Sequence, residues 1–461
     1  MLRAIRFVPF LLVAFALAAC TGESAPPADA PAADSPAAES RPSPPPPSPA
    51  PSPSPAAGYR PLGTSAGVAT TIADPRFDPV PGARASYGIL GRAAYRIEVP
   101  ENWNGELVLF AHGFAGFGTE VAVQNPPRAL REFLVANGFA WAASSYSENG
   151  YVPGIGADDT LALKRHFEAE VGRPARTYLV GASMGGNVVA LALEHHAGEY
   201  DGALALCGAL GGIEQIDYLV SWVALAEYLS GLSFPIGEPG ADLTSIFLTR
   251  LPARLGTPQA PTQAGRQFAS AIKHLTGGPR PFFAEGFAEQ YLVNFGLAMV
   301  DPERRLLVTR AATNQDHVYA IDPGLGITAE QLNAGVRRFA PDPAARNADA
   351  HPDAVPTTGR ITAPLLTLHN TGDLFVPISL EQSYLQKVRA AGRQDLLVQR
   401  AIRAGGHCQF SQQELTTAFS DLVRWVREGV RPAGDDLSGD LTDIGRQFTS
   451  PLRPGDPGGV N

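Results

Sequence analysis

The sequence predicts an α/β domain with a mostly parallel central sheet that carries helices on both of its faces. Two observations lead to this fold class. Short, continuously apolar stretches such as Leu107 to Phe110 alternate along the chain with amphipathic stretches of helical length. One passage from a strand into a helix contains the pentapeptide Gly181-Ala-Ser-Met-Gly185. Strands that alternate with helices form parallel sheets, and an uninterrupted apolar strand suits a sheet buried on both sides.

The first part of this core, residues 58–207, supplies most of the expected elements. We expect strands at 92–99, 106–110, 139–145, 177–180 and 203–207, the first of them antiparallel because its apolar residues alternate. Helices are expected at 126–137, 158–171 and 187–195. Gly138 is a typical helix stop, and Asp158 or Asp159 is expected to cap the start of the second helix.

From 208 to 358 the alternation stops, and a mainly helical insertion is expected, long enough to be a subdomain. Its helical stretches are 216–229, 265–275, 282–295 and 329–339. The core resumes over 359–430, with strands at 364–369 and 396–402 and helices at 379–391 and 412–428. The tail 431–461 is rich in Gly, Pro and Asp and is expected to lie on the surface or to be disordered.

The first 19 residues read as an export signal, with Arg3 and Arg6 followed by the apolar stretch 7–17. The end of this stretch, Leu-Ala-Ala-Cys20, resembles the lipobox of bacterial lipoproteins, which implies cleavage before Cys20 and its acylation. An ordinary cleaved signal and a single membrane anchor are the alternatives, but the apolar stretch is short for a span. We therefore expect an exported lipoprotein of the bacterial cell envelope, on its periplasmic or extracellular face.

Residues 20–57 are dominated by Pro, Ala and Ser and contain an unbroken proline run at 44–47. Such a segment cannot bury a core, and its prolines favour an extended conformation, so a disordered tether is expected. The formal net charge is −9. That sign disfavours binding to nucleic acid or to anionic lipid, so membrane contact is expected only through the lipid anchor at Cys20.

The motif Gly-x-Ser-x-Gly around Ser183 predicts a nucleophile elbow, a tight turn from a strand into a helix. Gly181 and Gly185 are needed because neighbouring backbone comes too close for a Cβ atom. The turn leaves the Ser183 hydroxyl exposed above the helix N-terminus. A bare turn serine is the alternative reading, and the rest of the chain decides between the two.

A serine hydroxyl becomes a nucleophile when an imidazole takes its proton and a carboxylate orients that imidazole. Asp373 follows the strand at 364–369, and His407 follows the strand at 396–402. The carboxyl ends of parallel strands share one edge of the sheet, where Ser183 also lies. Asp316 and Asp322 are alternative candidates for the acid, and His369 is the alternative candidate for the base.

The chain resembles the α/β-hydrolase superfamily over about residues 92–428. The resemblance rests on the order Ser183, Asp373, His407, on Thr371-Gly-Asp373 with Val376-Pro377, and on Gly406-His407. It implies the α/β-hydrolase fold, with the insertion placed as a lid between the sixth and seventh strands.

The oxyanion hole should use the backbone N–H of Met184, the residue after the nucleophile. The resemblance assigns the second donor to Phe114, after the family's His-Gly motif at His112-Gly113. His112 itself is expected to be structural.

Cys207 and Cys408 remain as an even pair once Cys20 is assigned to the signal, and a disulfide between them is expected in an exported protein. Two separate buried thiols are the alternative. Tannases and feruloyl esterases also carry a bridge near the histidine, but with a cysteine just before the serine. Here that position is Ala182, which departs from their pattern.

The expected function is a serine hydrolase that cleaves a small-molecule or oligomeric carboxylic ester through an acyl-enzyme. No metal site and no organic cofactor are expected, since no cluster with ligand spacing and no phosphate-binding loop occurs. A peptidase or amidase with the same triad is the main alternative, and a non-catalytic binding protein is another. Dehalogenases and epoxide hydrolases of this superfamily would need aspartate at position 183.

Overall fold

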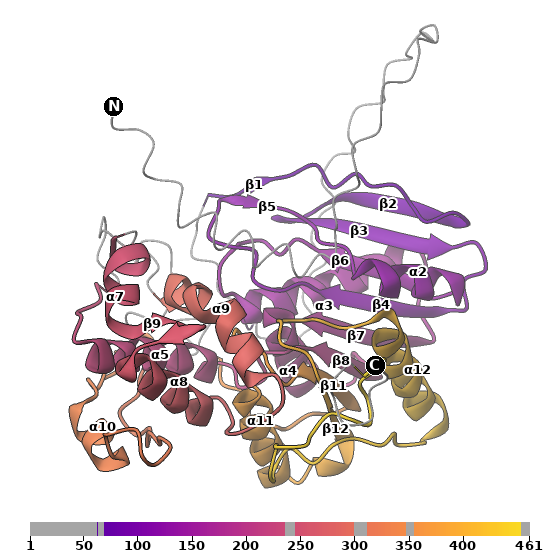
Figure 1. Cartoon of the computed structure of the whole chain (residues 1–461). Coiled ribbons are helices and arrows are strands. Elements are labelled where there is room, and N and C mark those ends of the chain that lie inside the picture. Colours follow the sequence, from indigo (N-terminus) through magenta and orange to yellow (C-terminus); the bar gives the residue numbers. More distant parts are fainter. Residues whose placement is uncertain (1–61, 63–68, 236–244, 299–310, 347–354, 453–461) are drawn as a thin grey trace, which may run out of the picture.

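The computed structural model describes residues 62, 69–235, 245–298, 311–346 and 355–452 (Figure 1). The predicted export signal, the lipidation site Cys20 and the whole predicted tether lie outside these residues. Within the described part of the chain, no helix is both long enough and apolar enough to cross a membrane.

An eight-stranded sheet forms the centre of the molecule, in the order β2-β3-β6-β4-β7-β8-β11-β12 (Figure 1). The strands are β2 (Ala83–Leu90), β3 (Ala93–Pro100), β4 (Glu106–Ala111), β6 (Ala140–Ser144), β7 (Arg176–Ala182), β8 (Gly202–Leu206), β11 (Leu365–Asn370) and β12 (Leu397–Ile402). The pairs β2–β3 and β3–β6 are antiparallel, and all other pairs are parallel. The predicted fold class is confirmed.

Helices cover both faces of this sheet. The helices α3 (Pro153–Glu170), α4 (Met184–His195) and α11 (Ser379–Ala390) pack on one face, and α2 (Arg128–Ala136) and α12 (Gln412–Glu428) pack on the other. The strands β4, β6, β8, β11 and β12 are buried along their whole length. This double burial explains why β4, β6 and β8 are mainly apolar without alternation. In β12, the buried Gln399 and Arg400 instead hydrogen-bond to Glu381 and Asp421.

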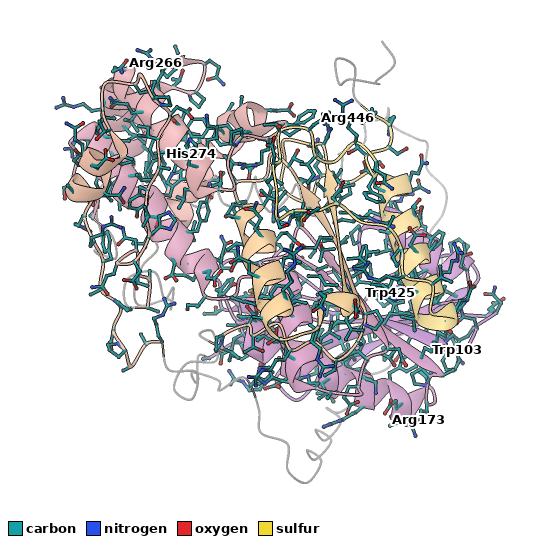
Figure 2. All side chains as sticks on the ribbon, turned by 90° about the horizontal axis from the view of Figure 1, so that it is seen from below. Trp103, Arg173, Arg266, His274, Trp425 and Arg446 are labelled. Atoms are coloured by element: carbon teal, nitrogen blue, oxygen red, sulfur yellow. A yellow bond between two sulfur atoms is a disulfide. The ribbon has the colours of Figure 1, made fainter. Side chains whose placement is uncertain are left out.

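The insertion lies between β8 and β11 and gathers beside the sheet. Its elements are α5 (Glu214–Ser230), a π-helical turn (Ile246–Arg250), α7 (Leu251–Leu255), the hairpin β9 (Gly256–Thr257) and β10 (Ala260–Pro261), α8 (Gln263–Leu275), α9 (Phe283–Ala298) and α10 (Ala329–Gly335). In Figure 2 it forms a body of its own, marked by Arg266 and His274, apart from the core with Trp103 and Trp425. Its aromatic residues make its own core: the ring of Trp222 lies 5.3 Å from Phe268 and 5.8 Å from Phe295.

Two predicted helix boundaries are wrong. The helix α10 ends at Gly335 and not at Phe339, because the following backbone pairs with the loop at Asn314, whose Oδ1 accepts from the Phe339 N–H at 2.7 Å. The helix α3 begins at Pro153, where the ring presets the helical φ angle, and neither Asp158 nor Asp159 caps it. The Asp159 carboxylate instead accepts a hydrogen bond from the Ser147 N–H at 2.7 Å.

Small elements complete the fold. The strands β1 (Thr71–Ile72) and β5 (Glu120–Val121) pair in parallel, and a 3₁₀ turn spans Gln394–Leu396. The tail is ordered on the surface as far as Leu452: Leu437, Leu441 and Ile444 are buried beside β12 and α11, in a cluster with Ile378 and Ala401. Of the two expected alternatives, a surface or a disordered tail, this stretch agrees with the first.

Asp159 makes folding stability depend on pH. Burial raises its pKa to about 6, although hydrogen bonds from Ser147 oppose the rise. The folded protein therefore binds a proton more tightly than the unfolded chain, and this contribution to stability is lost as the pH rises from about 4 to about 6. Asp159→Asn keeps an oxygen for the Ser147 N–H and removes the titration. Urea unfolding at pH 4 and pH 7 should show that the variant loses about 2 kcal/mol less stability over this range than the wild type; equal losses would contradict the assignment.

Candidate active site

Ser183 lies at a strained turn between β7 and α4. Its backbone has φ 58° and ψ −120°, a conformation that costs free energy in any residue other than glycine. A Cβ at Gly181 would lie 2.1 Å from the Gly185 carbonyl oxygen, and a Cβ at Gly185 would lie 2.0 Å from the Ala111 carbonyl oxygen. Both glycines are therefore required sterically, and the predicted elbow is present.

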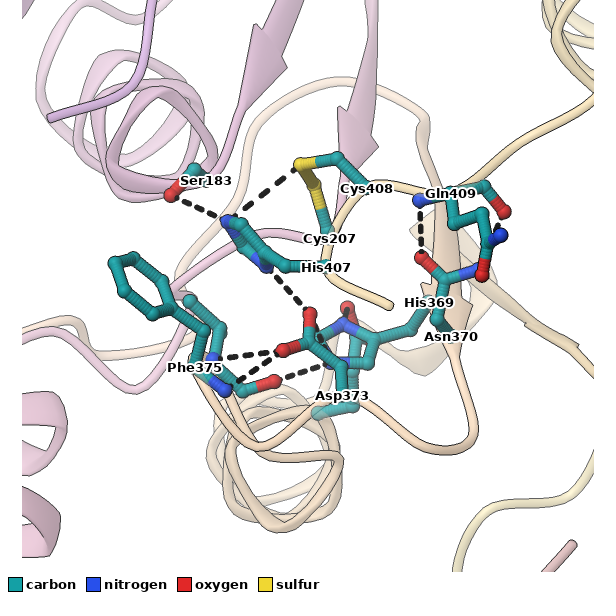
Figure 3. The surroundings of a disulfide bond; sticks show 11 residues. Ser183, Cys207, His369, Asn370, Asp373, Phe375, His407, Cys408 and Gln409 are labelled. Carbon is teal, nitrogen blue, oxygen red and sulfur yellow. Dashed lines mark hydrogen bonds and ion pairs between the residues drawn. A yellow bond between two sulfur atoms is a disulfide. The ribbon is translucent and has the colours of Figure 1, made fainter. Parts of the chain in front are cut away.

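Three side chains that are distant in sequence meet at the carboxyl ends of β7, β11 and β12 (Figure 3). The Nε2 atom of His407 lies 2.9 Å from the Ser183 Oγ, and its Nδ1 lies 2.6 Å from the Asp373 Oδ2. The other carboxylate oxygen of Asp373 accepts from the N–H groups of Phe375 at 2.9 Å and Val376 at 3.0 Å. Asp373 is thus fixed on both oxygens, and the imidazole can accept a proton from the serine.

The loop after β4 packs directly against the serine. A Cβ at Gly113 would lie 3.0 Å from the Ser183 Cβ, so the loop can come this close only because it carries glycine. The His112 Nδ1 donates to the Gly113 carbonyl at 2.7 Å, and its ring stacks on Tyr146 at 3.9 Å. Burial lowers the pKa of His112 and keeps its ring neutral. His112 shapes the loop that precedes Phe114 and does not face the serine.

A small cavity of about 40 Å³ opens beside the Ser183 hydroxyl. Both predicted oxyanion residues, Phe114 and Met184, line it, together with Tyr151, Ala209, Gln215, Ile216, Leu219, Phe375 and Val376. A larger cavity of about 350 Å³ lies inside the insertion, between α7, α8 and α9, and none of the three clustered side chains lines it. The small cavity is therefore the place next to the nucleophile where a substrate group can sit.

The rival residues are held elsewhere. The His369 Nε2 donates to the Val376 carbonyl at 2.8 Å, and its ring is fully buried behind the acid. Burial alone would lower the pKa of His369, but the Glu381 carboxylate 3.3 Å away raises it above the usual value. Asp322 binds Lys273 and His274, and these bonds outweigh desolvation and lower its pKa to about 2. Asp316 is exposed in the insertion.

The predicted disulfide is present between Cys207 and Cys408, with the two Cα atoms 5.2 Å apart (Figure 3). It joins the residue after β8 to the residue after His407, so it ties the histidine loop to the sheet. The Cys408 sulfur lies 3.6 Å from the His407 Nε2. The two sulfurs and a His407 nitrogen are close enough for a metal site, but sulfurs joined in a disulfide offer no thiolate ligand.

The sequence interpretation missed a group of insertion side chains that bind the loop around Asp373: Gln215, Tyr218, Arg280, Gln290 and Asn294. Amide and tyrosine side chains on amphipathic helices look like ordinary surface or core residues, so no sequence signal marks them. Gln215 also lines the small cavity, and its Oε1 has no hydrogen-bond partner among the described residues.

Comparisons with known proteins point to hydrolases. No family model matches the chain. The o-phthalyl amidase of Xanthobacter agilis is 22% identical over 407 residues, which cover 75% of this chain and 88% of the amidase.

Among solved structures, feruloyl esterase B from Aspergillus oryzae is 13% identical, with a TM-score of 0.41. The matched region covers 76% of this chain and 81% of the esterase. An acylaminoacyl peptidase from Pyrococcus horikoshii is 11% identical, with a TM-score of 0.39. Here the matched region covers 76% of this chain and 43% of the peptidase. These structural likenesses are too low to indicate a substrate, and the strand order and helix layers themselves define the architecture. The fold is the α/β-hydrolase fold. The nucleophile elbow follows its fifth sheet strand, and the insertion falls between the sixth and seventh.

Proposed function

We propose that the protein is a serine hydrolase that cleaves carboxylic esters through Ser183, His407 and Asp373. The observation that carries the proposal is the continuous chain of contacts, 2.9 Å from the Ser183 Oγ to the His407 Nε2 and 2.6 Å from the His407 Nδ1 to the Asp373 Oδ2. This arrangement sits on a strained elbow next to a small cavity. Strain of this kind persists where the surrounding structure enforces it, and it is common at catalytic sites.

In the proposed reaction, the Ser183 oxygen attacks the ester carbonyl carbon while its proton moves to the His407 Nε2. Asp373 holds the Nδ1 proton and stabilises the imidazolium that forms. The backbone N–H groups of Met184 and Phe114 donate hydrogen bonds to the carbonyl oxygen and stabilise its negative charge. His407 then gives its proton to the departing alkoxide, which leaves an acyl-enzyme. Water activated by the same imidazole releases the acid and restores the serine.

An amidase is the second candidate, favoured by the likeness to the o-phthalyl amidase. The same three side chains can act on an amide, provided that His407 delivers its proton to the leaving nitrogen. Ester and amide substrates therefore have to be compared directly.

We expect the protein to prefer short acyl chains. A cavity of about 40 Å³ holds about three groups the size of a water molecule. In a panel of p-nitrophenyl esters, kcat/KM for the acetate and butyrate should exceed that for the octanoate by about tenfold or more, because the octanoyl chain is too long for the cavity and would clash with the residues that line it. An o-phthalyl amide and an aminoacyl anilide complete the panel. Faster turnover of either amide than of all esters would favour the amidase.

We further propose that the protein is a lipoprotein of the bacterial envelope, acylated at Cys20. The lipobox-like Leu-Ala-Ala-Cys20 and the proline-rich 20–57 support this, as does the Cys207–Cys408 disulfide, a bond typical of oxidising compartments. Cells that express the wild type should incorporate an alkyne-tagged fatty acid into the protein, and Cys20→Ser should abolish the label. Removal of residues 1–57 should leave soluble activity intact. Equal labelling of the variant would refute acylation at this cysteine.

A further inference from the structure

The two loops that carry Asp373 and His407 are joined by one side chain of the insertion. Gln290, on α9, is 5% exposed. Its Oε1 accepts from the N–H groups of Leu374 at 3.0 Å and Phe375 at 2.6 Å. Its Nε2 donates to the carbonyls of Gly405 at 2.8 Å and Gly372 at 3.3 Å. A single amide therefore bonds the acid loop on both sides of Asp373 and the histidine loop two residues before His407.

The backbone of α9 packs as closely as its side chain. A Cβ at Gly286 would lie 1.7 Å from the Gly372 carbonyl oxygen and 2.8 Å from that of Gly405, so only glycine allows this contact. A Cβ at Gly372 would in turn meet the Phe282 carbonyl oxygen at 2.5 Å. The first turn of α9 therefore sits against both loops with no space between them.

Other insertion side chains hold the same acid loop. The Asn294 Nδ2 donates to the Leu374 carbonyl at 2.7 Å, and the Tyr218 hydroxyl donates to the same oxygen at 2.5 Å. Arg280 donates from Nε to the Thr371 carbonyl at 2.6 Å. Asn294 and Arg280 are buried, so these bonds form away from water, where an unpaired partner is costly. Displacing α9 would break the bonds of Gln290 and Asn294 together, and displacing α5 would break that of Tyr218.

We propose that Gln290 is a positioning residue for the proposed hydrolysis, and that α9 is a fixed part of the catalytic frame. The inference rests on the proposed function, and it adds that the insertion does more than cover the site. Gln290 bonds both loops and adds to the direct backbone bond between them, from the Gly372 N–H to the Ala404 carbonyl at 2.9 Å. We therefore expect Gln290 to fix the separation between Asp373 and His407 more closely than this backbone bond does alone. Substrate then enters without displacement of α9, since displacement of this helix would release both loops.

Gln290→Met is the direct test, because it keeps the length of the side chain and removes the four hydrogen bonds. We expect kcat to fall about 10²-fold, the loss typical of a misplaced catalytic group, with KM within about threefold. The rate of labelling by a fluorophosphonate should fall in parallel, although the final extent stays at one label per chain. Gln290→Asn keeps the amide but is too short to reach both loops. Its kcat should lie between those of the wild type and Gln290→Met.

Gln267→Met is the matched control. Gln267 also belongs to the insertion, and it donates one bond to the Leu325 carbonyl at 2.8 Å, away from the three clustered side chains. Its loss should leave kcat within about twofold of the wild type, as expected of a single surface hydrogen bond. If both folded Gln290 variants kept wild-type kcat and only lost thermal stability, the side chain would be structural and the proposal would be wrong.

A readout without turnover separates this inference from the proposed function. The hydrogen-bonded Nδ1 proton of His407 should give a low-field proton resonance, assigned by its loss in His407→Ala. We expect this resonance in the wild type and in Gln267→Met, and its loss or upfield shift in both Gln290 variants. If the wild type cleaves no ester or amide, the hydrolase proposal fails while this resonance still tests the positioning. An unchanged resonance in the Gln290 variants would overturn the inference.

Discussion

Replacing Ser183 by alanine is expected to lower kcat for every substrate by about 10⁶-fold and to abolish labelling by fluorophosphonates. The His407 Nε2 faces the Ser183 Oγ at 2.9 Å, so the variant loses the hydroxyl that would give its proton to the ring. The fold should survive. The Ser183 N–H donates to the Leu206 carbonyl at 2.9 Å through the backbone alone, and alanine meets the same strain at φ 58° as serine does.

Ser420→Ala provides the control for this experiment. Ser420 lies on the exposed side of α12, where its hydroxyl donates to the Thr416 carbonyl at 2.7 Å. The variant should be labelled and should turn over substrate like the wild type. Residual turnover by purified Ser183→Ala, at more than about one thousandth of the wild-type rate, would assign the nucleophile elsewhere. A wild type that neither reacts with the probe nor cleaves the panel would instead indicate a binding protein with this fold.

The sequence was sufficient to predict those parts of the fold that local chemistry determines. The buried strands β4 and β8 are apolar at nearly every position, and α12 begins with a Ser411-x-x-Glu414 capping box, so its start could be predicted. The elbow was predictable for a steric reason: the close approaches at Gly181 and Gly185 exclude every larger residue. In each case the residue type itself carries the structural requirement.

The parts that could not be predicted depend on contacts between distant segments. The start of α3 was misplaced because Asp159 looks like a helix cap, whereas its carboxylate binds the Ser147 N–H near the start of the preceding loop. The edge strand β2 was missed because exposed residues interrupt its alternation. Gln290 has no local signature, since its four partners lie more than eighty residues away in the chain. The proposed catalytic residues could be predicted from the sequence, whereas the side chain proposed to position them could not.

Asp373→Asn is expected to lower kcat by about 10⁴-fold while the fold remains intact. The Asp373 Oδ1 accepts from two backbone N–H groups, those of Phe375 at 2.9 Å and Val376 at 3.0 Å. In asparagine the side-chain oxygen must stay there, because an NH₂ group cannot face two donors. The NH₂ group therefore faces the His407 Nδ1, which must become an acceptor. The His407 Nε2 then carries the ring proton, so it cannot accept a proton from Ser183.

Asp322→Asn tests the assignment against its rival. Asp322 also contacts an imidazole, since its Oδ1 lies 2.8 Å from the His274 Nε2, but that pair belongs to the insertion. Steady-state kinetics should show kcat within about twofold of the wild type for this variant, as expected of a substitution outside the catalytic residues. Its thermal stability should fall, because the amide no longer pairs with Lys273. A large loss of kcat in Asp322→Asn with little loss in Asp373→Asn would transfer the role of the acid to the insertion. The opposite pattern is expected, because Asp373 alone of the two contacts the imidazole that faces Ser183.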